Sequence, residues 1–226
     1  MPAKNTLKTY ASDGFYHIYN RGVEKRDIFI DIKDYKVFLN YLKTYLLPVE
    51  NNDEDRIDFD EFKKPRLNIA NNNFFGKINL ICYCLMPNHF HMIIRQKDQS
   101  DMEYFMRSII TKYVKYFNKR YKRVGPLFQS RYKAINILTE EYILNLSCYI
   151  HLNPIKIVGK DNLLDYPWSS YSAYVNDYQI EWLEKRFLSI SYLKNNINSY
   201  KRLKDYDSRL YYQTETYKML IDKDSP

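Results

Sequence analysis

An α+β fold is predicted for this chain of 226 residues. Short apolar runs typical of buried strands alternate with longer segments whose apolar residues recur at helical spacing. Their order along the chain is strand, helix, strand, strand, helix, strand, helix. That order is typical of the split βαβ, ferredoxin-like arrangement, an antiparallel sheet with helices on one face.

The first part of the pattern contains a strand, a helix and a strand hairpin. Phe15–Asn20 (FYHIYN) is an aromatic and β-branched run, and Asp34–Leu47 follows with apolar residues at helical spacing. We expect Ile78–Leu85 (INLICYCL) and His89–Arg95 (HFHMIIR) to be paired strands, because a Met-Pro-Asn turn separates them.

The second part contains a helix, a strand and a helix. Asp101–Tyr121 keeps a three-four apolar spacing over nearly four turns before Gly125 and Pro126 end it. Lys133–Leu138 has the composition of a strand. Thr139–Leu152 is predicted to be a helix, with Thr139 as its N-cap and acidic residues in its first turn.

We expect a main domain over residues 1–154 and a C-terminal extension, helical in parts, over residues 155–226. A polar stretch at about residues 48–73 is interpreted as a surface insertion. No stretch approaches 18 apolar residues and the N-terminus lacks an apolar run, so neither a membrane span nor a signal peptide is expected. The three cysteines do not suggest a disulfide framework, which favours a reducing, cytoplasmic location.

The formal net charge of +8 and the pI of about 9.1 favour a polyanionic partner. Residues 107–133 contain nine cations, no acid and several interleaved aromatic residues, a composition typical of a nucleic-acid groove. A solvated helix face is the alternative, although such a face usually mixes charge signs. The nine cations are Arg107, Lys112, Lys115, Lys119, Arg120, Lys122, Arg123, Arg131 and Lys133.

His89 and His91 are separated by one residue within a predicted strand. Residues i and i+2 of a strand point to the same face, so both imidazoles would project together and Phe90 would point to the opposite layer. Two convergent imidazoles favour a metal site. A pair of surface histidines on an edge strand is the alternative.

Tyr149 and Asn153 are four residues apart at the end of a predicted helix, so a hydroxyl and an amide would share one face. Pro154 places Asn153 at the helix end. A core tyrosine with a C-capping asparagine is the alternative interpretation. The remaining histidines, His17 and His151, are interpreted as structural, and helical geometry turns His151 away from Tyr149.

Two other functions stay open at this point. Cys82 and Cys84 could join His89 and His91 in a structural zinc site of a nucleic-acid-binding module. The protein could instead be a non-catalytic RNA or DNA binder whose aromatic strand, FYHIYN, stacks bases.

Five ordered motifs between about Phe15 and Tyr174 resemble the single-tyrosine (HUH-type) transposases of insertion sequences. Within that group the match is closest to the REP-associated tyrosine transposases. The resemblance does not cover residues 53–73 or the tail after about residue 177. The motifs are YHIYNRG (Tyr16–Gly22), YCLMPNHFH (Tyr83–His91), GPLFQSRYK (Gly125–Lys133), YIHLNP (Tyr149–Pro154) and YPWSSY (Tyr166–Tyr171).

The resemblance implies the HUH endonuclease fold and a role for each matching residue. His89 and His91 would bind a divalent metal, Mg²⁺ or Mn²⁺, and Asn153 would complete the metal site. Tyr149 would be the nucleophile that forms a 5′-phosphotyrosine link. The motif residue Arg21 is expected to join the basic residues in contacting DNA.

The resemblance also implies the partner, which is single-stranded DNA with hairpins bound by a monomer or a homodimer. We expect nucleoid association for that reason. No nucleotide cofactor is expected, because the reaction conserves the phosphoester bond. The chain, with only five glycines, also has no glycine-rich phosphate loop.

Overall fold

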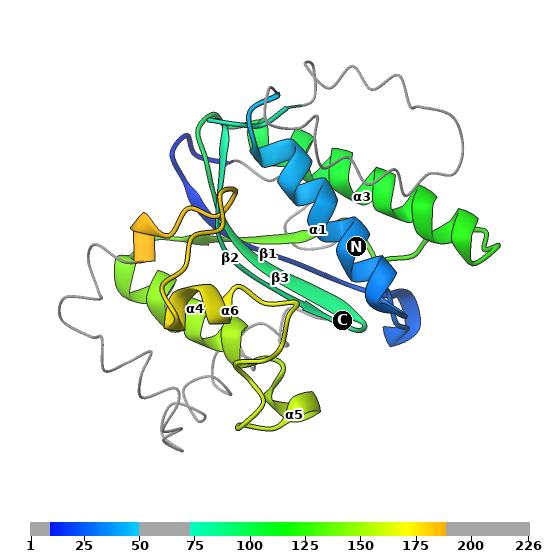
Figure 1. Cartoon of the computed structure of the whole chain (residues 1–226). Helices are drawn as coiled ribbons and strands as arrows, with labels where there is room; N and C mark the ends of the chain where they lie inside the picture. The colour runs from blue at the N-terminus through cyan, green and yellow to red at the C-terminus, as the bar shows by residue number, and fades with distance from the viewer. Residues whose placement is uncertain (1–9, 50–72, 189–226) are drawn as a thin grey trace, which may run out of the picture.

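The computed structural model describes residues 10–49 and 73–188, which contain a four-stranded antiparallel sheet (Figure 1). The strand order is β2-β3-β1-β4, as expected of two interleaved βαβ units. The predicted α+β, ferredoxin-like class is therefore confirmed. The strands are β1 (Phe15–Arg21), β2 (Ile78–Met86), β3 (His89–Gln96) and β4 (Lys133–Ile137).

Helices cover both faces of the sheet (Figure 1). Helices α1 (Ile32–Leu46) and α3 (Asp101–Arg120) pack together on one face, where the ring of Phe90 lies 5.4 Å from that of Phe38. Helix α4 (Glu140–Leu152) lies on the other face. The prediction that the helices share one face thus holds for α1 and α3 but not for α4.

The sequence of the central strands explains this second layer. Residues of β2 and β3 are buried almost without interruption, which requires cover on both faces. Cys82 lies opposite Ile93, and Cys84 lies opposite His91, so these four side chains share the face away from Phe90. Without α4 this largely apolar surface would be exposed to water.

Local signals define the helix ends. The Asp31 carboxylate accepts hydrogen bonds from the N–H groups of Lys33 and Asp34 at the start of α1. Thr139 caps α4 by accepting from the N–H of Tyr142, as predicted. Helix α3 ends at Arg120, shortly before two residues with positive φ, Lys122 and Gly125.

The described part of the extension covers the outer edge of β2. The N–H of Leu85 donates to the carbonyl of Trp168, and the N–H of Ser170 donates to the carbonyl of Tyr83. Because β2 ends the sheet, these bonds satisfy backbone groups that would otherwise form an open edge. Three further short helices in the described residues are η1 (Val23–Lys25), α5 (Ile155–Val158) and α6 (Tyr171–Val175).

The division at residue 154 stays a prediction, and most of the predicted insertion lies outside the described residues. Among the helices in the described ranges, none has the length and apolarity that crossing a bilayer requires.

Candidate active site on the α4 face of the sheet

Strand β3 brings two imidazoles to the face that α4 covers. His89 and His91 point to this face, and their ring centroids are 5.1 Å apart at an interplanar angle of 87°. His89 is half-buried and His91 is buried. The pairing of histidines expected from the strand pattern is therefore present.

Helix α4 adds two side chains to the same place. The Tyr149 ring meets His91 edge-on, with a centroid distance of 5.6 Å, and Asn153 Oδ1 lies 3.3 Å from His89 Nε2. Asn153 keeps helical backbone angles, φ −49° and ψ −43°, although Pro154 follows it. Its side chain therefore stays on the helix face of Tyr149, and the structure brings all four predicted residues together.

The hydrogen bonds around His89 define where its lone pair points. Asn88 Nδ2 donates to the Lys25 carbonyl, which leaves Asn88 Oδ1 to accept from His89 Nδ1 at 2.6 Å. The unprotonated nitrogen of neutral His89 is then Nε2. Asn153 Nδ2 donates to the Tyr149 carbonyl, so Asn153 Oδ1 is also an acceptor.

Two acceptors, His89 Nε2 and Asn153 Oδ1, thus face each other at 3.3 Å. In the neutral tautomer with the proton on His89 Nδ1, both atoms have lone pairs that a cation could bind. The residues present therefore fit a divalent metal ion, with His91 as a third donor. Asn88 had no signal in the sequence, because a turn asparagine beside a histidine is common.

The four-ligand zinc site that the sequence left open does not form. In the described ranges, no three or more histidine, cysteine or acidic side chains are placed to hold a metal ion. Cys82 and Cys84 are fully buried, and burial raises the pKa of both thiols well above the usual value. Both thiols are therefore packed within the core.

Burial controls the protonation of the other histidines. It lowers the pKa of His91 well below its usual value, and repulsion from the positive charge of Arg21, and from His89 and His17 whenever they are protonated, adds to this effect. Burial also lowers the pKa of His17 and of His151 to about 3. All three side chains are therefore neutral at pH 7.

His151 and His17 differ in their position relative to the site. His151 Nε2 lies 2.8 Å from Ser170 Oγ, away from Tyr149, as predicted. His17 Nε2 instead lies 2.9 Å from His91 Nδ1. The interpretation of His17 as a purely structural residue therefore missed a direct contact with the site.

Three predicted DNA-binding residues lie beside the site. Arg21 is exposed and pairs with His89 in the β1–β3 register. Lys133 Nζ lies 5.7 Å from the ring centroid of Tyr19, on the same sheet face. Arg131 is exposed in the loop before β4, and this loop is bonded to the end of β1 through the N–H of Gln129 and the carbonyl of Arg21.

The other predicted DNA-binding residues belong to α3 and its C-terminal loop, and α3 covers the opposite face. Lys115, Lys119 and Lys122 are exposed there. Lys112 is half-buried with its Nζ 4.6 Å from the Tyr45 ring centroid, and burial lowers its pKa to about 8. Arg123 lies over the ring of Phe117.

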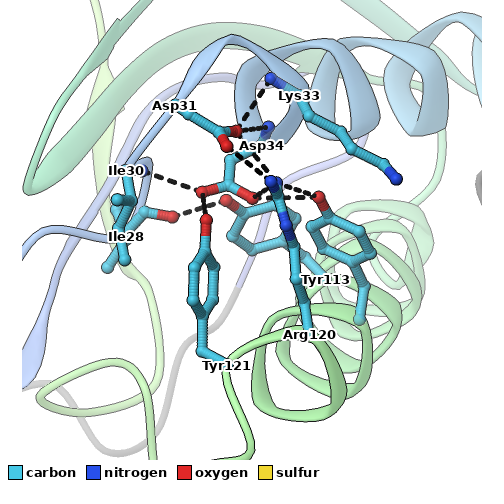
Figure 2. Close-up of polar contacts among 9 residues, drawn as sticks. Ile28, Ile30, Asp31, Lys33, Asp34, Tyr113, Arg120 and Tyr121 are labelled. Atoms are coloured by element: carbon cyan, nitrogen blue, oxygen red, sulfur yellow. Dashed lines mark hydrogen bonds and ion pairs between the residues drawn. The ribbon is translucent and has the colours of Figure 1, made fainter.

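Arg120 is engaged in a partly buried polar cluster (Figure 2). Its Nη1 donates to Asp34 Oδ1 at 2.7 Å and to Asp31 Oδ1 at 2.9 Å. The Asp34 side chain is fully buried, so this ion pair holds the start of α1 against the end of α3. Two carboxylates neutralise the charge of Arg120, and its expected contact with DNA stays a prediction.

Comparison with known proteins relates this site to a family. Residues 62–153 match the family described as "Transposase IS200 like". The matched stretch contains His89, His91, Tyr149 and Asn153. The chain resembles the IS200-like transposases. The resemblance to single-tyrosine transposases inferred from the sequence motifs is thus confirmed. It supports the interpretation of the chain as a transposase that acts on DNA.

A solved structure shows the same fold. It is described as a REP-associated tyrosine transposase bound to a REP hairpin, and the superposition has a TM-score of 0.51. The aligned residues are 16% identical and cover 80% of this chain and 92% of the transposase chain. No curated protein matches the chain significantly.

Proposed function

We propose that this protein is a metal-dependent transposase that cleaves and rejoins single-stranded DNA through a 5′-phosphotyrosine link on Tyr149. One observation carries the proposal. His89 Nε2 and Asn153 Oδ1 face each other as two acceptors, and the Tyr149 ring lies against the neighbouring His91. Such an arrangement suits a cation beside a nucleophile.

His89, His91 and Asn153 would hold the metal ion. Mg²⁺ and Mn²⁺ suit an amide oxygen and phosphate oxygens, and the two imidazoles shift the preference towards Mn²⁺. When bound, the ion supplies Lewis-acid polarisation of the scissile phosphate.

Tyr149 would provide the nucleophilic oxygen. Its oxygen loses the phenol proton and forms a bond to phosphorus as the bond from phosphorus to the 3′-oxygen breaks, and that oxygen takes up a proton to become a 3′-hydroxyl. A free phenol has a pKa near ~10, so positioning must contribute much of the rate. Because α4 packs on the sheet, it fixes Tyr149 relative to both histidines. A later attack by a 3′-hydroxyl on the phosphotyrosine rejoins DNA and restores Tyr149.

Arg21, Arg131 and Lys133 are the cations that would contact the DNA next to the site. Lys115, Lys119, Lys122 and Arg123 would contact a second part of the substrate around the end of the sheet. A hairpin is bulky enough to reach both surfaces. A hairpin is also what the structurally similar transposase binds. We propose a monomer or a homodimer as the active form, without a nucleotide cofactor.

A non-catalytic binder that stacks bases on FYHIYN is less compatible with the structure. Tyr16 and His17 are buried, and the Tyr19 ring is stacked against His17 and His91. The strand therefore does not offer an open aromatic platform of the kind that single-stranded RNA binders use.

Cleavage of a hairpin-bearing single strand tests the proposal. EDTA should abolish cleavage by the wild type and Mn²⁺ should restore it. His89→Ala and His91→Ala should each abolish cleavage while retaining most DNA affinity, because that affinity comes from the Lys and Arg side chains. Full activity in EDTA would remove the metal from the proposal, and absence of cleavage of every hairpin strand tested with Mn²⁺ would contradict it.

A further inference from the structure

His17 is a fully buried imidazole in direct contact with a proposed metal ligand. Its ring lies 5.1 Å from that of His91 at 17°, and 4.8 Å from that of Tyr19. Its Nε2 is 2.9 Å from His91 Nδ1. Its other nitrogen, Nδ1, is buried and has no hydrogen-bond partner within residues 10–49 and 73–188.

One proton must lie between the two rings, because a neutral imidazole has one N–H donor and one lone pair. If the proton is on His91 Nδ1, the lone pair of His91 is on Nε2 and can bind a cation. If it is on His17 Nε2, His91 Nε2 carries a hydrogen and cannot bind one. His17 Nδ1 has no partner for its N–H in the first arrangement and none for its lone pair in the second. It therefore does not select between them.

The hydrogen bonds of the other proposed ligand, His89, are consistent with a proton on His91 Nδ1. His89 Nδ1 donates to Asn88 Oδ1, which leaves His89 Nε2 as its coordinating nitrogen. With its proton on Nδ1, His91 would have the same tautomer as His89. The hydrogen bond to His17 and the packing of the Tyr19 ring against both imidazoles also restrict rotation of the His91 ring.

We propose that His17 is a positioning residue for the metal site, accepting the Nδ1 proton of His91 and thereby holding His91 Nε2 ready to bind the cation. This inference rests on the proposed function, since it requires His91 to be a metal ligand. Partners of this kind fix the tautomer and the orientation of ligating histidines, and their loss typically weakens metal binding by ~10- to 100-fold.

A matched control exists in the same chain. His151 is as buried as His17, but its Nε2 partner is Ser170 Oγ rather than a ligand. His17→Phe and His151→Phe therefore make the same chemical change in two equally buried places. His17→Gln is the conservative variant, because a glutamine amide oxygen can take the place of Nε2 as an acceptor.

Mn²⁺ binding to the full chain without DNA, followed by electron paramagnetic resonance, is the test. We expect His17→Phe to weaken Mn²⁺ binding by ~10- to 100-fold. His17→Gln should bind within a few-fold of the wild type and His151→Phe should bind like the wild type. Thermal melting of each variant measures how much of the protein is folded. If His17 had a purely structural role, His17→Phe would reduce the folded fraction but leave the Mn²⁺ affinity of that fraction unchanged.

The outcomes separate this inference from the function on which it rests. Equal Mn²⁺ affinity in folded His17→Phe and wild type, with loss in His91→Ala, would overturn the role of His17 and leave the metal site intact. No Mn²⁺ binding by the wild type would overturn both. If His17→Phe does not fold, ¹⁵N–¹H correlation of the wild-type histidines decides, since a proton on His91 Nε2 rather than Nδ1 contradicts the proposal.

Discussion

Replacing Arg120 by methionine should destabilise the protein far more than it weakens DNA binding. The guanidinium pairs with the fully buried carboxylate of Asp34. Asp34 also accepts hydrogen bonds from the N–H of Ile30 and from the hydroxyls of Tyr116 and Tyr121, with donor–acceptor distances of 2.8, 2.9 and 2.8 Å. Arg120→Met therefore leaves a buried carboxylate with three neutral donors and no counter-charge.

The size of the effect follows from that environment. Removing one partner of a buried ion pair costs ~3–5 kcal/mol. The three remaining donors solvate Asp34 in part, so we expect a loss of about 2–3 kcal/mol in the free energy of unfolding. The half-exposed Asp31 adds little. For a chain of this size the loss corresponds to a melting temperature lower by about 5–10 °C.

Thermal and urea unfolding of Arg120→Met measure the loss, with Lys115→Met as the matched control on the exposed side of the same helix. The control should change stability by no more than ~0.5 kcal/mol. Adding Asp34→Asn to Arg120→Met should recover part of the loss, because the uncompensated charge is removed. An Arg120→Met variant that unfolds like the wild type but loses DNA affinity as Arg21→Met does would refute this reasoning.

Three further predictions concern the ligand, the pH and the substrate. Asn153→Ala should need more Mn²⁺ for half-maximal cleavage while Asn153→Gln is tolerated, and an unchanged metal titration of the alanine variant would show that another residue completes the site. His17 and His151 have a pKa of about 3 in the folded chain, against the ordinary histidine value of 6.5 in the unfolded chain. Between these values the unfolded chain binds more protons, so stability should fall as the pH falls from about 6.5 towards 3. Urea titrations of the metal-free chain should show the fall, and His151→Phe should flatten the slope by up to ~1.4 kcal/mol per pH unit, whereas an unchanged slope would exclude His151 as a contributor. Hairpin-bearing single strands should be cut and the same sequence as a perfect duplex should not, with single-strand binding weakening by ~0.7 log units per log unit of salt for each phosphate contact, and efficient duplex cleavage would indicate an ordinary nuclease.

Much of the fold could be predicted because its signals are local. Helix α3 keeps its apolar spacing over many turns, and the structure moves its predicted C-terminal end by one residue, from Tyr121 to Arg120. Thr139 caps α4 as its residue type predicts. The face that α4 covers could not be predicted, because apolar side chains point to both sides of β2 and β3 and spacing alone does not select one.

The ligand pair and the nucleophile could also be predicted, but their supporting residues could not. His89 and His91 carry a spacing signal within one strand, and Tyr149 and Asn153 carry one within one helix. His17 meets His91 only through the β1–β3 register, which joins residues 74 positions apart. A lone histidine in an aromatic strand has no pattern that reveals such a partner.

The basic segment shows a limit of counting charges. Residues 107–133 contain nine cations in the sequence, yet Arg120 is neutralised by Asp31 and Asp34. Lys112 is directed towards Tyr45 of α1 instead of solvent. Composition therefore predicts a charged segment, whereas the partners that reduce its charge come from α1, at the far side of the predicted insertion.

Detection of a covalent adduct on Tyr149 is the most direct test of the central claim. The full chain is incubated with Mn²⁺ and a hairpin strand labelled on the 3′ side of the cut, and then denatured. Wild type should give a shifted, labelled band, and mass spectrometry should place the nucleotide on the peptide that contains Tyr149. Tyr149→Phe should bind the DNA and give no band. A wild-type protein that cleaves without any adduct at short times, or a Tyr149→Phe protein that still forms one, would contradict the account.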